Sequence, residues 1–241
     1  MKRTNYDEIA ERYHRRGMSP TSVFGYAKLS QILGYIKGKL ILDYGCGTGK
    51  FSRVLAENGG LVIGVEPSQK MLDLAISNHL YNPISSQGFF LPFPYPIPLD
   101  TQFPYAVSTF VFCTMQSNEE MLESIAFIYN CLNPKGKFVL LDPHPDCLGH
   151  NFMSFRKERP ENLQSGSSIV TNLEGLEETI IDYWHSREDY ENLLRKMGFK
   201  IEQVHEPILT DVPTIHYYCE QAILIQEEIK VPPFIIIEAS K

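Results

Sequence analysis

Three closely spaced glycines and two carboxylates could together bind a nucleoside. Asp43 ends one apolar run of the sequence, Gly45, Gly47 and Gly49 follow it at alternate positions, and Glu66 ends the next apolar run. Glycine has no Cβ, so the backbone there can turn tightly and a ligand can approach it closely. A carboxylate at the tip of the following strand can accept hydrogen bonds from both hydroxyls of a ribose. Because ligands in open α/β sheets bind beyond the carboxyl ends of the strands, the pattern predicts a nucleoside site at that edge.

The spacing of the glycines distinguishes between classes of nucleotide cofactor. The dinucleotide fingerprint is Gly-x-Gly-x-x-Gly, and Lys50 stands where its third glycine would be. The chain instead has Gly-x-Gly-x-Gly, which disfavours a nicotinamide-dependent oxidoreductase. A helix is expected to begin near Thr48 or Gly49, where its unpaired N–H groups can meet an anionic or polar group of the ligand.

Five sequence motifs, in the same order, resemble those of the class I S-adenosylmethionine-dependent methyltransferases. The first is the Asp-x-Gly-x-Gly-x-Gly turn, and the others extend the resemblance over most of the chain. They are Glu66 to Leu72, similar to Asp/Glu-x-Ser-x-x-Met-Leu; Leu91 to Phe93, similar to a Leu-Pro-Phe motif after the third strand; residues 132–138, similar to a Leu-Lys-Pro-Gly-Gly turn before the fifth strand; and Trp184 to Phe199, similar to the family's last helix and its Ala-Gly-Phe exit.

The resemblance implies an α/β, Rossmann-like methyltransferase fold, with a mostly parallel seven-stranded sheet, an antiparallel last strand and helices on both faces. It implies the cofactor S-adenosyl-L-methionine and the product S-adenosyl-L-homocysteine. In the family the matching Asp and glycines cradle the methionine part of the cofactor, the acid matching Glu66 binds the ribose, and the residues after it lie near the adenine. The cofactor-binding residues expected on this basis are Tyr13, Asp43, Gly45, Cys46, Gly47, Gly49, Glu66, Pro67, Met71, Gln87, Gly88 and Thr109.

One position departs from the family's pattern. Many relatives carry an acid four residues before the leucine of Leu-Pro-Phe, where it contacts the adenine amino group, and this chain has Gln87 there. A glutamine carbonyl can still accept a hydrogen bond from that group, but without charge. Gln87 is therefore either an adenine contact or an ordinary loop residue.

The alternation of apolar and polar segments predicts a single methyltransferase domain over residues 1–241, in which helices alternate with strands. The N-terminal helices are expected within about residues 1–36. Helices are expected at 5–16, 22–35, 119–132 and 187–196, with strands that end at Asp43, at Glu66 and near Gln87, and further strands at 103–113, 136–142, 199–204 and 234–238.

Two segments do not fit this alternation. Prolines at every second position from Pro92 to Pro98 exclude a helix or a central strand. This segment is therefore expected to be a stiff surface connector. The alternative is a binding site for a partner that recognises polyproline. Residues from about 144 to 183 form a long insertion after the fifth strand, and loops of that length are usually functional. We expect this insertion to be a lid over the substrate that is mobile until ligand binds.

Methyl transfer needs positioning more than acid or base chemistry, because the positive sulfur of the cofactor already makes its methyl group reactive. A base is needed only if the nucleophile carries a proton of high pKa. His144 and His185 bracket the insertion, so they are the candidate catalytic residues, although either can instead be a hydrogen-bonded structural residue. The alternation Asp142-x-His144-x-Asp146 could suggest a metal, but the intervening prolines suit a rigid turn and no further ligand cluster is apparent, so no metal is expected.

The acceptor is expected to be a small metabolite that is methylated on an O or N atom. The Asn/Asp-Pro-Pro-Tyr motif of nucleic-acid amino methyltransferases is absent after the fourth strand, where Cys113 to Gln116 stand. The segments Trp184 to Ser186 and Val231 to Ile237 resemble those of small-metabolite methyltransferases, including the toxoflavin-type N-methyltransferases. A non-catalytic binding or regulatory protein that keeps the cofactor fold is the alternative, and the identity of the acceptor stays open.

The composition is that of a globular enzyme, with 43% hydrophobic and 21% charged residues. The net charge of -7 argues against a nucleic-acid partner. The apolar runs are too short to span a membrane, and the polar N-terminus shows no signal peptide. Five cysteines without paired or metal-type spacing indicate free thiols in a reducing compartment, hence a cytoplasmic protein, expected as a monomer or homodimer.

Overall fold

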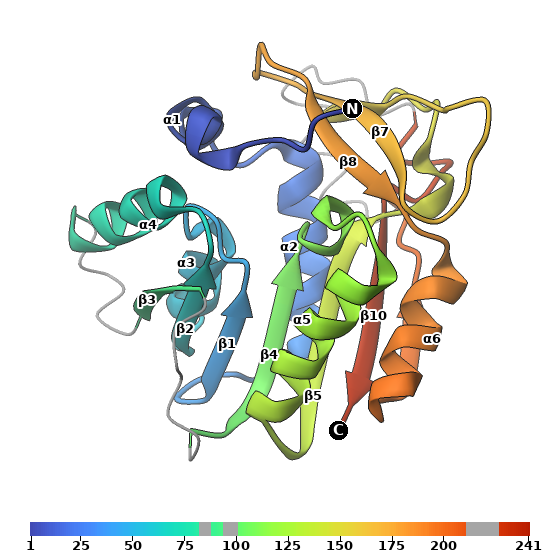
Figure 1. Ribbon diagram of the computed structural model, residues 1–241. Coiled ribbons are helices and arrows are strands. Elements are labelled where there is room, and N and C mark those ends of the chain that lie inside the picture. The colour runs from blue at the N-terminus through green and yellow to red at the C-terminus, as the bar shows by residue number, and fades with distance from the viewer. Residues whose placement is uncertain (82–87, 94–100, 211–226) are drawn as a thin grey trace.

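The computed structural model describes residues 1–81, 88–93, 101–210 and 227–241, which fold around a seven-stranded sheet (Figure 1). The strand order is β3-β2-β1-β4-β5-β10-β9. The strands from β1 to β5 pair in parallel, and β10 is antiparallel to both β5 and β9. This confirms the predicted Rossmann-like sheet with an antiparallel last strand. The strands are β1 Leu40–Tyr44, β2 Leu61–Glu66, β3 Gly88–Pro92, β4 Phe103–Thr109, β5 Leu132–Pro143, β9 Lys200–His205 and β10 Phe234–Ser240.

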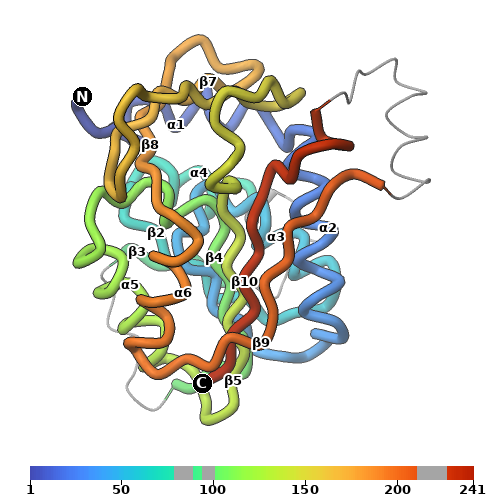
Figure 2. Tube along the Cα trace, turned by 90° about the vertical axis from the view of Figure 1, so that its right-hand side faces the viewer, coloured from blue at the N-terminus to red at the C-terminus, as the bar shows by residue number. Residues whose placement is uncertain are grey.

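The sheet is buried between two helical layers, because successive residues of a strand point to opposite faces. In β5, Val139 and Leu141 belong to the core under α2 and α3, while Phe138 and Leu140 belong to the core under α5 and α6. Figure 2 shows these layers on either side of the sheet. No helix in the described part of the chain is long and apolar enough to cross a bilayer. The helices are α1 Tyr6–Arg15, α2 Pro20–Leu33, α3 Lys50–Glu57, α4 Gln69–Tyr81, α5 Asn118–Cys131 and α6 Arg187–Met197.

The insertion at residues 144–183 contains most of a second, smaller sheet and is not the open loop that the sequence led us to expect. The strands β6 Phe155–Lys157, β7 Ser167–Leu173 and β8 Ile180–Trp184 pair antiparallel in that order. This sheet lies beyond the carboxyl ends of β4 and β5 (Figure 1). The β-branched side chains in β7 and β8 favour extended backbone, and the pairing satisfies backbone groups that a long loop would leave to water.

Several strand boundaries differ from those predicted; the fifth strand, for example, begins at Leu132, four residues earlier than expected. The third strand does not end near Gln87 but runs from Gly88 to Pro92, so two of the three Leu-Pro-Phe residues lie within it. A proline is tolerated there because β3 is an edge strand of the sheet. The fourth strand stops at Thr109, because the chain turns at Phe110 with a positive φ of 59°. Gln87 and residues 94–100, which hold most of the proline-rich segment, lie outside the described residues.

Candidate active site

The glycine turn between β1 and α3 is built from residues with positive φ. Gly45, Gly47 and Gly49 have φ values of 71°, 55° and 74°, which favour glycine over other residues. A Cβ on Gly45 would collide with Val111, and one on Gly49 would come within 3.1 Å of the Phe90 ring. A Cβ on Gly47 would meet no atom within 4 Å. The first and third glycines are therefore needed for packing, whereas Gly47 borders open space.

Glu66, at the tip of β2, joins the glycine turn to the start of α4. Its Oε2 accepts a hydrogen bond from the Gly47 N–H, and its Oε1 accepts one from the Ser68 N–H, both at 2.9 Å. Burial raises the pKa of Glu66 above its usual value, and these two backbone donors act in the opposite direction. Each carboxylate oxygen keeps acceptor capacity for a further donor.

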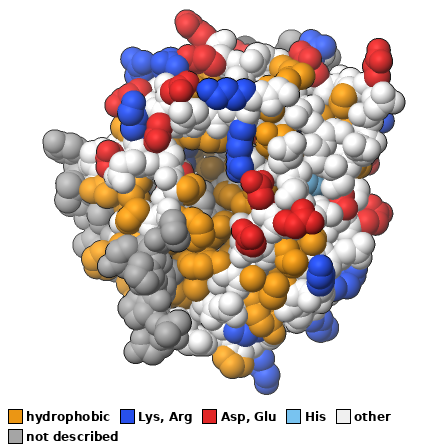
Figure 3. Space-filling view, in the orientation of Figure 1, with side chains coloured by type: hydrophobic (Ala, Val, Ile, Leu, Met, Phe, Trp, Pro, Cys, Tyr) orange, Lys and Arg blue, Asp and Glu red, His pale blue; other side chains and the backbone are white. Residues whose placement is uncertain are grey.

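A cavity of about 400 Å³ lies against this turn. Figure 3 shows hydrophobic side chains gathered around a hollow on this face, with charged side chains along its upper rim. The cavity brings together most of the cofactor residues that the sequence predicts. Those on its wall are Tyr13, Gly45, Cys46, Gly47, Glu66, Pro67, Met71 and Thr109.

Four predicted cofactor residues do not line this cavity in the described structure. Asp43 lies beneath the turn, where it is 1% exposed and accepts a hydrogen bond from the Ser52 hydroxyl. Burial raises the pKa of Asp43 to about 7. Gly49 caps the start of α3, and Gly88 lies at the amino end of β3, the end away from the glycine turn. Gln87 is outside the described residues.

Residues at the start of α1 complete the wall of the cavity, and the sequence reasoning missed them. Asn5, Tyr6 and Asp7 line it together with Ser68. The Asp7 carboxylate accepts hydrogen bonds from the Ser68 hydroxyl at 2.6 Å and from the Lys70 N–H at 3.0 Å. These bonds lower the pKa of Asp7. The N-cap residue Asn5 signals where the helix begins, but no local pattern shows that the helix covers the site.

Lys50 links α1 to the glycine turn through hydrogen bonds. Its Nζ donates to the carbonyls of Tyr13 at 3.0 Å and Gly17 at 2.6 Å, and it lies 4.4 Å from the centre of the Tyr13 ring. Burial, helped by the positive charges of Arg16 and Arg53, lowers the pKa of Lys50 to about 7. The residue that breaks the dinucleotide fingerprint therefore holds the covering helix in place.

His144 is hydrogen-bonded at a position outside the cavity. Its Nδ1 accepts from the Asp146 N–H at 3.0 Å, which leaves Nε2 to donate to Glu206 Oε1 at 3.2 Å. The side chain caps a short 3-10 turn directly after β5. Within the described ranges no group of three or more His, Cys, Asp or Glu residues could hold a metal ion. The geometry gives His144 a structural task, and its catalytic role stays a prediction.

His185 is likewise engaged away from the cavity. Its Nε2 donates to the Met115 carbonyl at 2.8 Å, so its Nδ1 is left to accept from the Ser165 hydroxyl at 3.1 Å. Burial lowers the pKa of His185, which favours the neutral ring. Both histidines line a space of about 20 Å³ whose wall comes mostly from the insertion. Neither histidine lines the 400 Å³ cavity, and their contact with the acceptor stays a prediction.

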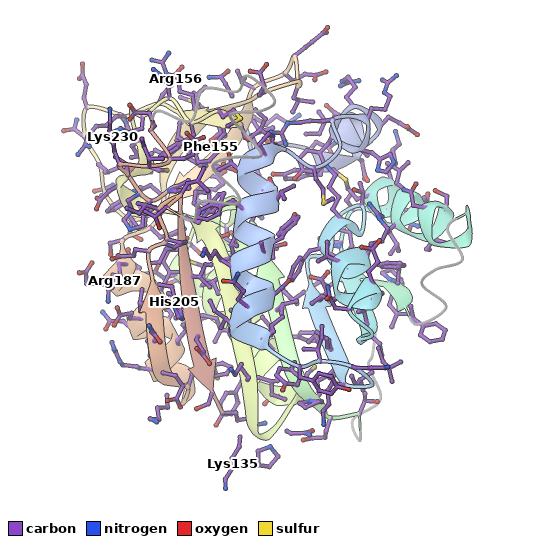
Figure 4. The ribbon with its side chains drawn as sticks, turned by 180° about the vertical axis from the view of Figure 1, so that it is seen from behind. Lys135, Phe155, Arg156, Arg187, His205 and Lys230 are labelled. Carbon is purple, nitrogen blue, oxygen red and sulfur yellow. The ribbon has the colours of Figure 1, made fainter. Side chains whose placement is uncertain are left out.

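A second cavity, of about 70 Å³, lies between the carboxyl end of β5 and the insertion. Tyr6, Tyr13 and Phe110 line both cavities, so the two cavities adjoin at these residues. Phe155 and Phe234 supply part of its apolar wall. Figure 4 labels Phe155, which belongs to β6 of the insertion and lies near the start of α2. A smaller cavity therefore lies beside a larger one.

Comparison with known proteins identifies the fold and the cofactor. A family model that describes a methyltransferase domain matches residues 24–204. This chain belongs to that methyltransferase family. The N-demethylindolmycin N-methyltransferase of Streptomyces griseus is 30% identical over 187 residues, which cover 73% of this chain and 76% of that protein. The methyltransferase is thus an enzyme that uses S-adenosylmethionine.

Solved structures agree with this assignment at the level of the fold. The S-adenosylmethionine-dependent methyltransferase of Mesorhizobium loti superposes with a TM-score of 0.66 at 22% identity, covering 92% of this chain and 98% of that one. The glycopeptide N-methyltransferase MtfA, solved with S-adenosylmethionine, superposes with a TM-score of 0.64 at 15% identity, covering 92% and 93% of the two chains.

The residues of the larger cavity fit the cofactor. The open space in front of Gly47 lets a ligand approach the backbone, and the Glu66 oxygens retain acceptor capacity for ribose hydroxyls. When bound, the cofactor supplies an electrophilic methyl group. Glu66 and the glycine turn are the residues that would hold the nucleoside, and the start of α1 would cover it.

Proposed function

We propose that this methyltransferase transfers a methyl group to an N or O atom of a small-molecule metabolite. The observation that carries the proposal is the 70 Å³ cavity, which adjoins the cofactor cavity across Tyr6, Tyr13 and Phe110. Small-molecule sites are concave and mostly apolar, with a few placed polar groups. A space of this size under an ordered insertion suits a small molecule better than a folded macromolecule.

The comparison with N-demethylindolmycin N-methyltransferase supports a small acceptor, since that relative is named for methylation of a nitrogen on a small molecule. The net charge of -7 also disfavours a polyanionic substrate. Nitrogen is the better supported of the two target atoms, because the relative's name specifies it.

The residues between the cavities would position the acceptor. Burial raises the pKa of both Tyr6 and Tyr13, so at neutral pH each is a neutral phenol that can donate or accept a hydrogen bond but is not a base. Their rings can exclude water from the path of the methyl group, which is the main requirement of a displacement at an activated methyl.

Transfer of an isotopic label tests the proposal. The protein is incubated with methyl-labelled S-adenosylmethionine and, separately, with the small-molecule, protein and RNA fractions of a cell extract. We expect label in the small-molecule fraction only. Label that enters protein or RNA, or no label in any fraction, would contradict the proposal.

A further inference from the structure

A buried polar cluster in the insertion has one carboxylate oxygen without a hydrogen-bond donor. Lys157 of β6, Thr171 of β7 and Asp182 of β8 are 4%, 1% and 3% exposed. Lys157 Nζ pairs with Asp182 Oδ2, and the Thr171 hydroxyl donates to the same oxygen at 2.9 Å. Among the described residues, Asp182 Oδ1 has no partner. Both donors therefore converge on one oxygen and leave the other unsatisfied.

An unsatisfied buried acceptor is costly, so its persistence suggests a partner that the protein chain does not itself supply. All three residues of the cluster line the 70 Å³ cavity. A ligand in this cavity is thus in the neighbourhood of Asp182, and an N–H or O–H group on it could satisfy Oδ1. The apolar walls from Phe155, Leu173 and Phe234 would receive the rest of such a ligand.

The charges around the cavity favour a neutral donor over a cation. Lys157 and Asp182 offset each other, and Arg16, which also lines the cavity, adds a positive charge. The Arg16 guanidinium donates to the backbone carbonyls of Ser154 and Glu174 and forms no ion pair among the described residues, and the exposed Glu174 carboxylate offsets only part of its charge. An ammonium group would meet this excess positive charge. A nucleophile also needs a free lone pair, which a neutral amine, a ring nitrogen or a hydroxyl provides.

We propose that Asp182 Oδ1 recognises the methyl acceptor, and that the acceptor class is a small, largely apolar molecule bearing a neutral N–H or O–H donor. Lys157 and Thr171 act as positioning residues that hold the carboxylate. This assignment rests on the proposed function, because it names the acceptor class of the same site.

Binding of matched probes tests the assignment in the full-length protein saturated with S-adenosylhomocysteine. The probes are benzyl alcohol, a neutral donor; toluene, of similar shape without a donor; and benzylammonium, a cation. Ligand-observed NMR titration gives the three Kd values for the unchanged protein and for Lys157→Met/Asp182→Leu. The double variant removes both charges together, because removal of one partner would leave the other charge buried and unpaired. Asp73→Asn, at an exposed position of α4, is the matched control.

We expect the Kd ratio of toluene to benzyl alcohol to fall about tenfold or more in the double variant, the scale of a hydrogen bond to a charged group. The ratio should be unchanged in Asp73→Asn, and benzylammonium should bind the unchanged protein more weakly than benzyl alcohol. A crystal of the unchanged protein with benzyl alcohol should show the hydroxyl at hydrogen-bond distance from Asp182.

Three outcomes would overturn the assignment. They are an equal ratio in the unchanged protein and the double variant, tighter binding of benzylammonium than of benzyl alcohol, and binding of no probe while S-adenosylhomocysteine is bound. If label still enters the small-molecule fraction in any of these cases, the proposed function stands and only the role of Asp182 is wrong. If no label enters that fraction, the proposed function itself fails.

Discussion

Glu66 has two tasks that a single substitution would remove together. It accepts backbone hydrogen bonds from Gly47 and Ser68, and it faces the cavity with acceptor capacity to spare. We predict that Glu66→Ala weakens S-adenosylhomocysteine binding by about 1.5–3 kcal/mol, the range for hydrogen bonds to a charged group. Calorimetry measures the effect. Glu57→Ala, at an exposed position of α3, should bind as the unchanged protein does, and equal affinity in both variants would refute the ribose role of Glu66.

Lys50 makes the stability of the protein depend on pH in a defined direction. Its pKa is lowered from 10.5 to about 7 in the folded state. The unfolded chain binds a proton at Lys50 more readily than the folded protein does. The contribution of Lys50 to the free energy of unfolding is therefore fully present above pH 10.5 and is lost as the pH falls toward 7. The free energy of unfolding should rise between pH 7 and 9 by at most about 1.4 kcal/mol per pH unit from this group.

Urea denaturation at pH 7, 8 and 9 isolates the contribution of Lys50 by comparison with Lys50→Met. The variant should lack this part of the rise, whereas Lys37→Met, at an exposed position, should keep it. Parallel curves for the unchanged protein and Lys50→Met would show that Lys50 stays charged after folding. The sequence revealed Lys50 only as a missing glycine, because its partners Tyr13 and Gly17 lie far away along the chain.

At the scale of elements, the glycines of the turn differ in what surrounds them. Both Gly45 and Gly47 have positive φ, so alanine at either position carries a similar backbone strain of about 1–2 kcal/mol. Only at Gly45 does the added Cβ collide with Val111, and overpacking costs roughly 1–3 kcal/mol more. We predict that Gly45→Ala is the less stable variant in thermal or urea unfolding.

Gly47→Ala should instead lose more cofactor affinity than stability, because its Cβ projects into space that no protein atom occupies. The two variants are controls for each other, since the substitution and the sign of φ are the same. If Gly47→Ala proved as destabilised as Gly45→Ala and bound S-adenosylhomocysteine normally, the space at Gly47 would have no part in ligand binding.

Elements with complete local signals were predicted well. In α6, Ser186 caps the N-terminus and forms a capping box with Asp189, and Gly198 ends the helix with a φ of 104°. The insertion lacked such signals, because β6 has only three residues and the pairing partners are distant along the chain. The glycine turn and the strand that ends at Glu66 were recognisable for the opposite reason, because the positive φ of the glycines and the apolar run of β2 are local features of the chain.

At the scale of the whole molecule, α1 and the residues that flank it connect the 400 Å³ cavity to the insertion. On one side, Asp7 accepts hydrogen bonds from Ser68 and Lys70 at the start of α4. On the other side, the Thr4 hydroxyl accepts from the Ile181 N–H at 2.7 Å, and Arg16 donates to carbonyls of the insertion. No sequence pattern could predict this bridge, since it joins segments more than 60 residues apart. The cover over the site is therefore α1 and the insertion together.

These contacts predict which segments gain hydrogen-exchange protection when ligand binds. The strands β7 and β8 already pair with each other, so the larger gain in hydrogen-exchange protection on addition of S-adenosylhomocysteine should occur in α1 and in the connections of the insertion. Asp7→Ala removes the acceptor at the start of α4, where a carboxylate is also favoured by the helix dipole. The variant should lose most of the ligand-induced protection of α1 and bind the ligand more weakly.

Glu11→Ala, at an exposed position of the same helix, should behave as the unchanged protein. Protection of α1 that is equally high with and without ligand would show that the cover is rigid, and unchanged protection in Asp7→Ala would place the coupling between cavity and insertion elsewhere.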